Sequence, residues 1–345
     1  MTVTYLELRA QLRPDEIDGF HEAAEGLGVL SSRFPQPHDR VVAVEGPADA
    51  LASLGSHPAV RGHLALDPRF PLVSRGRVPE GRHVQVGDLE FGGESFVLAA
   101  GPCSVEDAEQ IGTIASALRG LGVRGLRGGV HKPRTSPHDF QGLGEEGLHL
   151  LRHVAQRHRM AVITEVLDAS QISGMLPHVD MFQVGARNMQ NFTLLRALAE
   201  QPKPVLLKRG PGATWKEWLL AAEHLVIRGQ EQVVLCERGI RTFEDATRFT
   251  LDLASAVLAK QRTWCPVVVD PSHGTGVPSL IPAMSLAALA AGLDGVLVEV
   301  HHQPEHALSD GAQALRPEEF AALVRALRAA APTFGRVIPA GEEEP

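Results

Sequence analysis

Several features of secreted and disulfide-stabilised proteins are missing from this sequence of 345 residues. It contains only three cysteines, Cys103, Cys236 and Cys265. They are far apart and odd in number, so we expect no disulfide framework, and a reducing compartment fits better. The N-terminus lacks a basic stretch followed by an apolar run, so no signal peptide is expected.

Long apolar runs and an excess of positive charge are missing as well. The most apolar segment, residues 281–300, is interrupted by Gly292, Asp294 and Gly295, so it predicts a helix followed by a buried strand and not a membrane span. The net charge of −8 and the pI near 6.1 argue against a nucleic-acid partner held by bulk electrostatics. We therefore expect a cytoplasmic protein with neither a membrane nor a nucleic-acid partner.

The length allows one large domain and a small one. Residues 3–68 alternate in the order β-α-β-β-α-β, which predicts a ferredoxin-like domain over 1–70. Within it we find neither a nucleophile with a base nor a metal-ligand cluster, so it is expected to be a sensor or only an oligomerisation module. Residues 71–94 predict a linker with a small hairpin around Gly87 and Asp88, placed as a plug under the next domain.

From Ser95 onward, strand-like apolar runs alternate with amphipathic segments of helical length. The runs begin near Phe96, Val123, Ala161, Met181, Val205, Val233, Val267 and Val296. This repetition predicts a (β/α)8 TIM barrel over 95–333, followed by a flexible tail over 334–345. A doubly wound open sheet is the alternative, but no Gly-x-Gly-x-x-Gly turn follows the first run.

Capping signatures predict where several helices of the barrel begin. Such signatures occur at Ser104–Asp107, Thr214–Glu217 and Thr242–Asp245. The last helix is expected to open at Pro317 and to run to about Ala331.

A stiff basic loop follows the second predicted barrel strand. Arg127 leads into Lys132-Pro133-Arg134, and Thr135 and Ser136 follow. Proline restricts the loop, so two cations and two hydroxyls are held in an array that suits phosphate or carboxylate oxygens. The alternative to an anion-binding loop is a basic turn that is only exposed to solvent.

Because chemistry in such barrels collects where the strands end, we compared these ends. Strands starting near Val123, Met181, Val205 and Val233 contribute cations: Arg127, Lys132, Arg134, Arg187, Lys208 and Arg238. Although the protein as a whole is acidic, these cations would repel one another at the barrel mouth unless anions bound there. The pattern predicts two phosphorylated substrates, or one phosphate and a carboxylate.

Three neighbouring strand ends contribute a different set of residues: Cys103, His273, Glu299 and Asp310. Each alone has a structural explanation, such as packing for Cys103. Together, sulfur, nitrogen and oxygen donors suit one divalent ion such as Mn, Fe, Co or Zn, and its identity stays open. His301 and His302 are expected to lie outside this site, and Glu165 could be an acid/base group or hold an arginine.

Six motifs of the sequence resemble those of 3-deoxy-D-arabino-heptulosonate 7-phosphate (DAHP) synthases. They are GPCSVED, LRGG…KPRTSP…FQGLGEEGL, GARNMQN, LCERGIRTFE, VDPSHGTG and VEVH…ALSDG. More narrowly, the chain resembles the class with an N-terminal ferredoxin-like domain. The resemblance implies condensation of phosphoenolpyruvate with erythrose 4-phosphate, with release of phosphate, in the shikimate pathway to aromatic amino acids. It also implies a homo-oligomer, with a tetramer favoured, and feedback control by tyrosine or phenylalanine.

The resemblance assigns a role to each matched residue. Cys103, His273, Glu299 and Asp310 would bind the metal, and catalysis would depend on Lys132, Cys103 and His273. Phosphoenolpyruvate would be held by Arg127, Lys132, Arg187, Lys208 and Arg238. Erythrose 4-phosphate would be held by Arg134, Thr135 and Ser136.

Two alternatives stay open at this point. The sister 3-deoxy-D-manno-octulosonate 8-phosphate synthase uses arabinose 5-phosphate, but the Lys-Pro-Arg-Thr-Ser loop and the front domain argue against it. The other alternative is an inactive, amino-acid-sensing barrel. The chain also departs from the family in loops after three strands, at Gly210–Ala213, Val277–Ser279 and His302–Gln303, which concerns loop closure, metal preference and subunit contacts more than the reaction.

Overall fold

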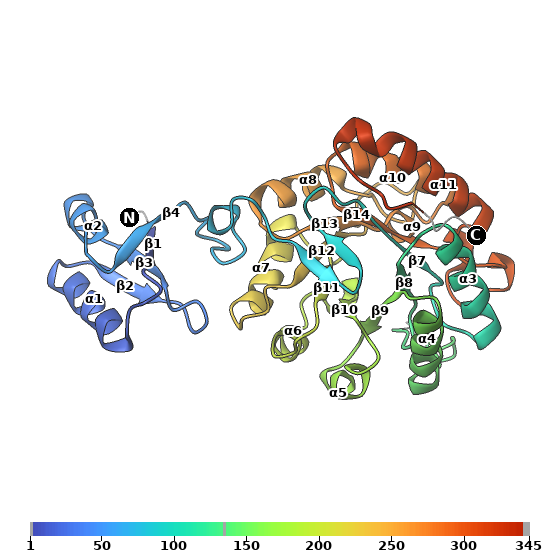
Figure 1. The fold of residues 1–345 in the computed structure, drawn as a ribbon, viewed down its shortest axis with the longest axis horizontal. Helices are drawn as coiled ribbons and strands as arrows, with labels where there is room; N and C mark the ends of the chain where they lie inside the picture. The colour runs from blue at the N-terminus through green and yellow to red at the C-terminus, as the bar shows by residue number, and fades with distance from the viewer. Residues whose placement is uncertain (1–2, 134–135, 341–345) are drawn as a thin grey trace.

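The computed structural model describes residues 3–133 and 136–340, which form a small N-terminal lobe and a larger barrel (Figure 1). The small lobe consists of β1 (Thr4–Leu8), α1 (Pro14–Gly26), β2 (Leu30–Arg33), β3 (Val41–Glu45), α2 (Ala48–Gly55) and β4 (Val60–Leu64). Its strands pair antiparallel in the order β2-β3-β1-β4. Buried residues of the strands and of both helices form one core, which includes Leu6, Phe20, Val42 and Leu54. The predicted ferredoxin-like arrangement is confirmed.

A hairpin closes one end of the barrel. It pairs β5 (Val84–Val86) with β6 (Leu89–Phe91) through the turn at Gly87 and Asp88. The apolar side chains of both strands pack against residues inside the barrel, among them Ile163 and Leu206. The predicted plug is therefore present.

Eight parallel strands close into the predicted barrel. They are β7 (Val97–Gly101), β8 (Gly125–Arg127), β9 (Ala161–Val166), β10 (Met181–Val184), β11 (Val205–Lys208), β12 (Val233–Glu237), β13 (Val267–Val269) and β14 (Gly295–Glu299). Each pairs with its neighbours in sequence, and β14 returns to β7. Strands such as β13 and β14 are buried at every position, as expected for parallel strands covered on both faces.

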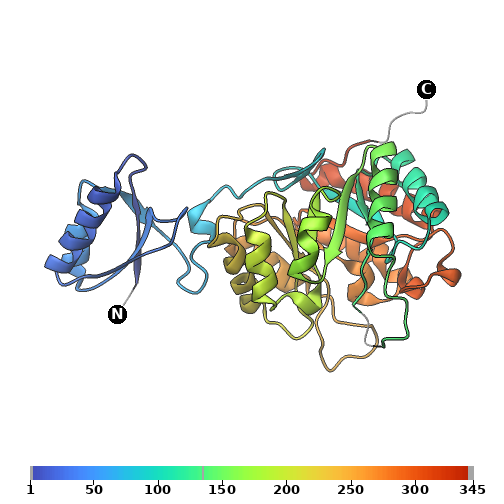
Figure 2. The same cartoon turned by 90° about the horizontal axis from the view of Figure 1, so that it is seen from below.

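Helices surround the barrel (Figures 1 and 2). They are α3 (Ala108–Gly120), α4 (Glu145–Arg157), α5 (Ile172–Met175), α6 (Phe192–Ala199), α7 (Trp215–Val226), α8 (Leu253–Arg262), α9 (Pro271–Thr275), α10 (Ile281–Ala290) and α11 (Pro317–Ala330). Short 3-10 turns include η1 (Arg75–Arg77), η6 (Gly311–Gln313) and η7 (Ala331–Phe334). Among the described helices, none combines the length and apolarity needed to cross a membrane.

The capping predictions have mixed outcomes. Thr214 and Glu217 form the predicted capping box at the start of α7. Helix α3 begins after Asp107, whose side chain accepts from the Gln110 amide, so Ser104 is not its cap. The helix predicted near Thr242 is wrong.

Tertiary contacts explain the failure at Thr242. Residues 242–250 form a loop, because Ile240 pairs with Thr250 and the Arg248 amide donates to the Thr275 carbonyl. Helix α8 begins only after Asp252, whose side chain accepts from the Ser255 amide.

The segment after α11 also differs from the expected flexible tail. Val337 pairs with Ser95, extending the contact beside β7. The Arg336 guanidinium donates to the carbonyls of Gly93 and Gly292, and Arg328 donates to the Pro339 carbonyl. Residues up to Pro339 are thus bound to the barrel, whereas 341–345 lie outside the described residues.

Candidate metal centre and anion-binding cavity

A cavity of about 530 Å³ opens at the carboxyl ends of the barrel strands. Seven cationic side chains of the described residues line it: Arg127, Lys132, Arg187, Lys208, Arg238, Arg241 and Arg248. Of the carboxylates in the described residues, only Glu165 and Asp310 line it with them. The strand ends therefore bring together the predicted cations that the structure describes. Arg241 and Arg248 were not predicted as site residues, because Arg248 lies in the loop that was expected to be a helix and Arg241 directly precedes that loop.

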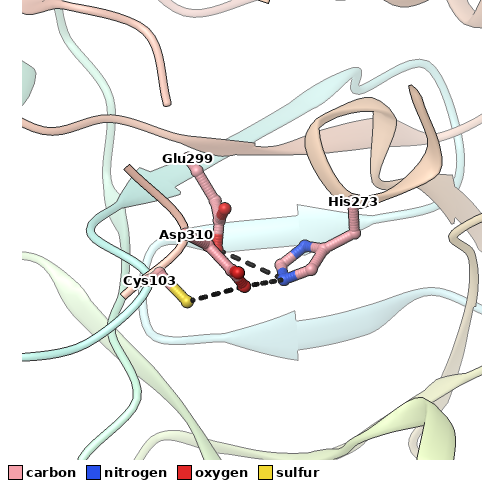
Figure 3. Close-up of side chains that lie close together, drawn as sticks. All are labelled: Cys103, His273, Glu299 and Asp310. Carbon is pink, nitrogen blue, oxygen red and sulfur yellow. Dashed lines mark hydrogen bonds and ion pairs between the residues drawn. The ribbon is translucent and has the colours of Figure 1, made fainter. Parts of the chain in front are cut away.

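Four potential metal donors lie close together (Figure 3), and two of them, His273 and Asp310, line this cavity. The ligand atoms of Cys103, His273, Glu299 and Asp310 all lie within 4.8 Å of one another. They come from the loop after β7, from α9, from the end of β14 and from the loop after β14. Barrel closure makes these distant segments neighbours, since β14 pairs with β7.

Asp270 orients the histidine of this group. Its Oδ2 lies 2.7 Å from His273 Nδ1, and its Oδ1 accepts from the His273 amide at 2.9 Å. Because Asp270 accepts from Nδ1–H, the lone pair of Nε2 faces Glu299 and Asp310, at 3.3 and 3.9 Å. Burial lowers the pKa of His273, opposed by Asp270 and Glu299, which favours the neutral ring that binds metals.

Asp270 also reaches the anion-binding side of the cavity. Lys208 Nζ donates to its Oδ2 at 2.5 Å, and both side chains are buried. Burial alone would raise the pKa of Asp270, but His273 and Lys208 hold that pKa well below its usual range. Asp270 is a residue that the sequence reasoning missed, although it immediately follows β13 and its motif was noted.

Glu299 is held at both carboxylate oxygens. Arg127 Nη1 donates to Oε1 at 3.0 Å, and Gln313 Nε2 donates to Oε2 at 2.5 Å. Burial would raise the pKa of Glu299, but His273 and Arg127 lower it, so the carboxylate is ionised. Gln313, also missed from the sequence, fixes the orientation of this carboxylate.

The side chain of Cys103 is buried and contacts Lys132. Lys132 Nζ lies 2.9 Å from its sulfur and 3.0 Å from its carbonyl oxygen. Burial, reinforced by the charge of Glu299, raises the pKa of the Cys103 thiol to about 12. The sulfur is therefore a thiol before metal binding, and binding must release its proton.

Two unusual backbone conformations, at Asp310 and Gly101, shape the surroundings of the four donors. Asp310 has φ +51°, a left-handed conformation that is unusual for a residue other than glycine. Gly101, at the end of β7, has φ +148°, and a Cβ there would lie 2.0 Å from the Arg127 carbonyl oxygen. Only glycine allows β7 and β8 to approach so closely at the site.

The donor set fits a divalent transition metal. One sulfur, one imidazole nitrogen and two carboxylates converge, the histidine is oriented by a carboxylate, and Glu299 is fixed on both sides. Mixed donors of this kind favour borderline metals over Mg²⁺ or Ca²⁺. Among the described residues, this is the only cluster of its kind.

The remaining predicted residues lie around the cavity or beside it. The Arg238 guanidinium lies over the Phe249 ring, 4.3 Å from its centroid, and Arg187 donates to the Pro133 carbonyl. Arg134 and Thr135 lie outside the described residues. Ser136 is described but does not line the cavity, and its hydroxyl accepts from the His138 amide.

Two other groups near the strand ends have structural partners. His301 is buried, with Nε2 3.1 Å from Gln110 Nε2 and 3.5 Å from Glu106, so it turns away from the donor cluster as expected. Arg209 forms ion pairs with Glu237 and Asp252 and does not line the cavity.

Comparison with known sequences now places the chain in a family. The DAHP synthetase I family matches residues 80–332. The chain belongs to the DAHP synthetase I family. The match covers the whole barrel, from the hairpin to the last helix, so the resemblance predicted from the motifs is confirmed.

The relatives of this DAHP synthetase I member include enzymes with two different names. It is 47% identical over 266 residues to the phospho-2-dehydro-3-deoxyheptonate aldolase of Thermotoga maritima, covering 77% of this chain and 79% of the relative. It is 32% identical over 252 residues to the 2-dehydro-3-deoxyphosphooctonate aldolase of Koribacter versatilis, covering 67% of this chain and 89% of the relative.

Solved structures align with this chain over both of its lobes. The crystal structure of the Thermotoga maritima DAHP synthase aligns with a TM-score of 0.78 at 40% identity, covering 98% of this chain and 99% of that one. A truncated form of the same enzyme aligns with a TM-score of 0.74 at 43% identity, covering 79% of this chain and all of that one. The similarity to the full Thermotoga maritima structure thus extends over the small lobe as well as the barrel.

Proposed function

We propose that this chain condenses phosphoenolpyruvate with erythrose 4-phosphate to give DAHP and phosphate, the first step of the shikimate pathway. The observation that carries the proposal is the cationic cavity with the Cys103, His273, Glu299 and Asp310 cluster at its side. Both substrates are anionic, and the Thermotoga maritima relative bears the name of this activity.

The proposed cofactor is one divalent ion, Mn, Fe, Co or Zn, held by Cys103, His273, Glu299 and Asp310. When bound, such an ion supplies Lewis-acid polarisation of the aldehyde carbonyl. Asp270 and Gln313 support its ligands, through the His273 ring and the Glu299 carboxylate.

Phosphoenolpyruvate is proposed to bind at Arg127, Lys132, Arg187, Lys208 and Arg238. All five line the cavity, so its phosphate and carboxylate would meet several cations there. Erythrose 4-phosphate is assigned to Arg134, Thr135 and Ser136, which continue the same loop after Lys132 and Pro133. A single loop would then hold both substrates and keep their reacting carbons close.

The chemistry needs one proton donor and one water. The enol carbon of phosphoenolpyruvate attacks the aldehyde carbon, and the aldehyde oxygen gains a proton. Water then adds at the carbon that bears the phosphate, and the C–O bond breaks to release phosphate. Lys132, beside Cys103 and lining the cavity, is our candidate for protonating the aldehyde oxygen. Glu165, also in the cavity, is a candidate to orient the water or an arginine.

The proposal is tested by phosphate release from phosphoenolpyruvate with either erythrose 4-phosphate or arabinose 5-phosphate. We expect strong preference for erythrose 4-phosphate. The alternative, 3-deoxy-D-manno-octulosonate 8-phosphate synthase, is favoured by the 32% identical relative and predicts the opposite preference. No turnover with either sugar would favour an inactive sensing barrel.

Metal dependence is tested in the same assay. Incubation with a chelator should abolish turnover, and added Mn²⁺ should restore it, because the thiol, imidazole and carboxylate donors have no other shared role in the proposal. Full activity after removal of all bound metal would exclude this role.

We further propose that the small lobe, residues 1–70, senses tyrosine or phenylalanine, and that the protein is a cytoplasmic homo-oligomer, with a tetramer favoured. Deletion of residues 1–70 should preserve turnover and remove inhibition by these amino acids. Inhibition that persists in the shortened chain would refute the sensor assignment.

A further inference from the structure

Gln313 and Arg248 connect the proposed metal ligands to a loop of the cavity. Gln313 is buried in η6, three residues after Asp310. Its Nε2 donates to Glu299 Oε2 at 2.5 Å, and its Oε1 accepts from Arg248 Nη1 at 2.6 Å. Arginine can only donate and an ionised carboxylate can only accept, so this chain of bonds permits one orientation of the amide.

Arg248 contacts two segments that carry proposed ligands and reaches a third through Gln313. Its Nη1 lies 3.6 Å from Asp310 Oδ1, and through Gln313 it reaches Glu299. Its backbone amide donates to the Thr275 carbonyl at 2.8 Å, at the end of the helix that carries His273. Its Cβ packs over Gly276, where an added Cβ would lie only 2.6 Å away. This loop residue is therefore fixed to the donor cluster from several sides.

The same residue lines the anion-binding cavity. Arg248 and Arg238 both lie near the Phe249 ring, with guanidinium carbons 5.8 and 4.3 Å from its centroid. Arg248 is 39% exposed, so part of the guanidinium remains open to the cavity. One side chain thus contacts both the ligand carboxylates and the space assigned to the substrates.

We propose that Arg248 and Gln313 form a positioning pair, in which Arg248 orients the Gln313 amide and Gln313 holds Glu299 in its ligand orientation. The pair links the β12–α8 loop to the metal centre. This inference rests on the metal site of the proposed function, and it adds two residues that touch neither the ion nor the substrates' reacting atoms.

The test is the affinity of the whole protein for Mn²⁺, measured after metal removal by the electron paramagnetic resonance signal of free Mn²⁺. Gln313→Met keeps the side-chain volume but removes the donor to Glu299. We expect binding about 10- to 100-fold weaker, as for other groups that orient metal ligands. Gln190→Met, which removes an amide from the same cavity, should bind Mn²⁺ like the wild type.

Arg248→Gln separates positioning from simple electrostatics. Removal of a cation near the ion should strengthen Mn²⁺ binding if charge repulsion dominates. The positioning pair predicts weaker binding, because the Gln313 amide loses the partner that orients it. Arg241→Gln, the same change on the same loop and cavity, should not weaken binding. Because Arg248 is partly exposed, this variant also tests the pair if Gln313→Met fails to fold.

The double variant tests the connection between the two residues. If they act as a pair, Gln313→Met with Arg248→Gln should bind Mn²⁺ no more weakly than the weaker single variant. The Co²⁺ absorption spectrum should change in the same variants, since it reports ligand geometry. Wild-type affinity and spectrum in Gln313→Met, or additive losses, would overturn the pair but leave the proposed function intact. A wild type that binds no Mn²⁺ would overturn both.

Discussion

Asp270 joins the two halves of the site. One of its oxygens accepts from the His273 amide, and the other contacts both His273 Nδ1 and Lys208 Nζ. The proposed metal ligand and a proposed phosphoenolpyruvate ligand are thus fixed by one buried carboxylate. Its charge matters more than its shape, because the backbone contact needs only an acceptor.

Asp270→Asn should therefore separate the two roles. Asparagine caps a helix as well as aspartate, so α9 should be retained. The neutral amide no longer compensates Lys208 or enforces the His273 tautomer, and we expect metal affinity to fall about 10- to 100-fold. Chelator competition measures this loss. Asp252→Asn, at another helix cap with a cationic partner, serves as the control and should keep wild-type affinity.

Cys103 supplies the only sulfur in the donor cluster. Cys103→Ser replaces it with a hard, weakly acidic hydroxyl, so we expect metal affinity to fall by at least about tenfold. Metal content after dialysis, measured by atomic absorption, checks this. Cys265→Ser makes the same change at a buried cysteine outside the cluster and should retain the metal. Unchanged metal content in Cys103→Ser would refute the assignment.

At the scale of elements, α7 is where the barrel holds the linker from the small lobe. Glu223 on this helix accepts from the Val73 amide at 2.9 Å. Nearby, the Trp264 indole donates to the Leu72 carbonyl. Burial raises the pKa of Glu223 from 4.5 to about 7, although bonds to the linker amides oppose the shift. A carboxyl group that titrates near neutrality therefore lies at the junction.

This raised pKa predicts a pH-dependent stability. Between about pH 4.5 and 7, the folded state keeps a proton on Glu223 that the unfolded state has lost. The contribution of Glu223 to stability should thus decrease as pH rises through this window, by up to about 3 kcal/mol. Denaturant unfolding of wild type and Glu223→Gln at pH 5 and pH 8 measures the difference. A difference between the two proteins that is independent of pH would contradict the prediction.

At the scale of the whole molecule, the small lobe lies beside the barrel (Figure 1), and polar contacts join its His38 and the linker residues Arg77 and Arg82 to it. His38 Nε2 lies 2.5 Å from the Val226 carbonyl oxygen at the end of α7. Arg77 Nη2 bonds both His38 Nδ1 and Glu231, and Arg82 also pairs with Glu231. Glu231 therefore joins the barrel to the linker and, through Arg77, to the lobe.

Glu231→Gln should loosen this junction. The pairs are partly exposed, so the cost should be only about 1 kcal/mol in global stability. Local opening should nevertheless increase trypsin cleavage at Arg77 and Arg82 several-fold. Glu200→Gln, which breaks an exposed pair with Arg228 on the barrel surface, is the control and should leave cleavage at the linker unchanged. Equal cleavage of both variants would show that Glu231 does not hold the linker.

Much of the architecture follows from local pattern. Alternating apolar runs predicted all eight barrel strands, and the turn at Gly87 and Asp88 predicted the plug. The false helix at Thr242 and the bound segment around Val337 show the limit of such patterns. In both places, pairing with distant residues determined the backbone, as between Ile240 and Thr250 and between Ser95 and Val337.

The sequence by itself determined which residue types reach the barrel mouth, because strand ends in a (β/α)8 fold share one face. That was enough to group Cys103 with His273, Glu299 and Asp310. Only the tertiary structure decided how they are supported, through Asp270, Gln313 and Arg248. These contacts depend on side-chain direction and loop path between residues far apart in the chain, and sequence periodicity carries no information about either.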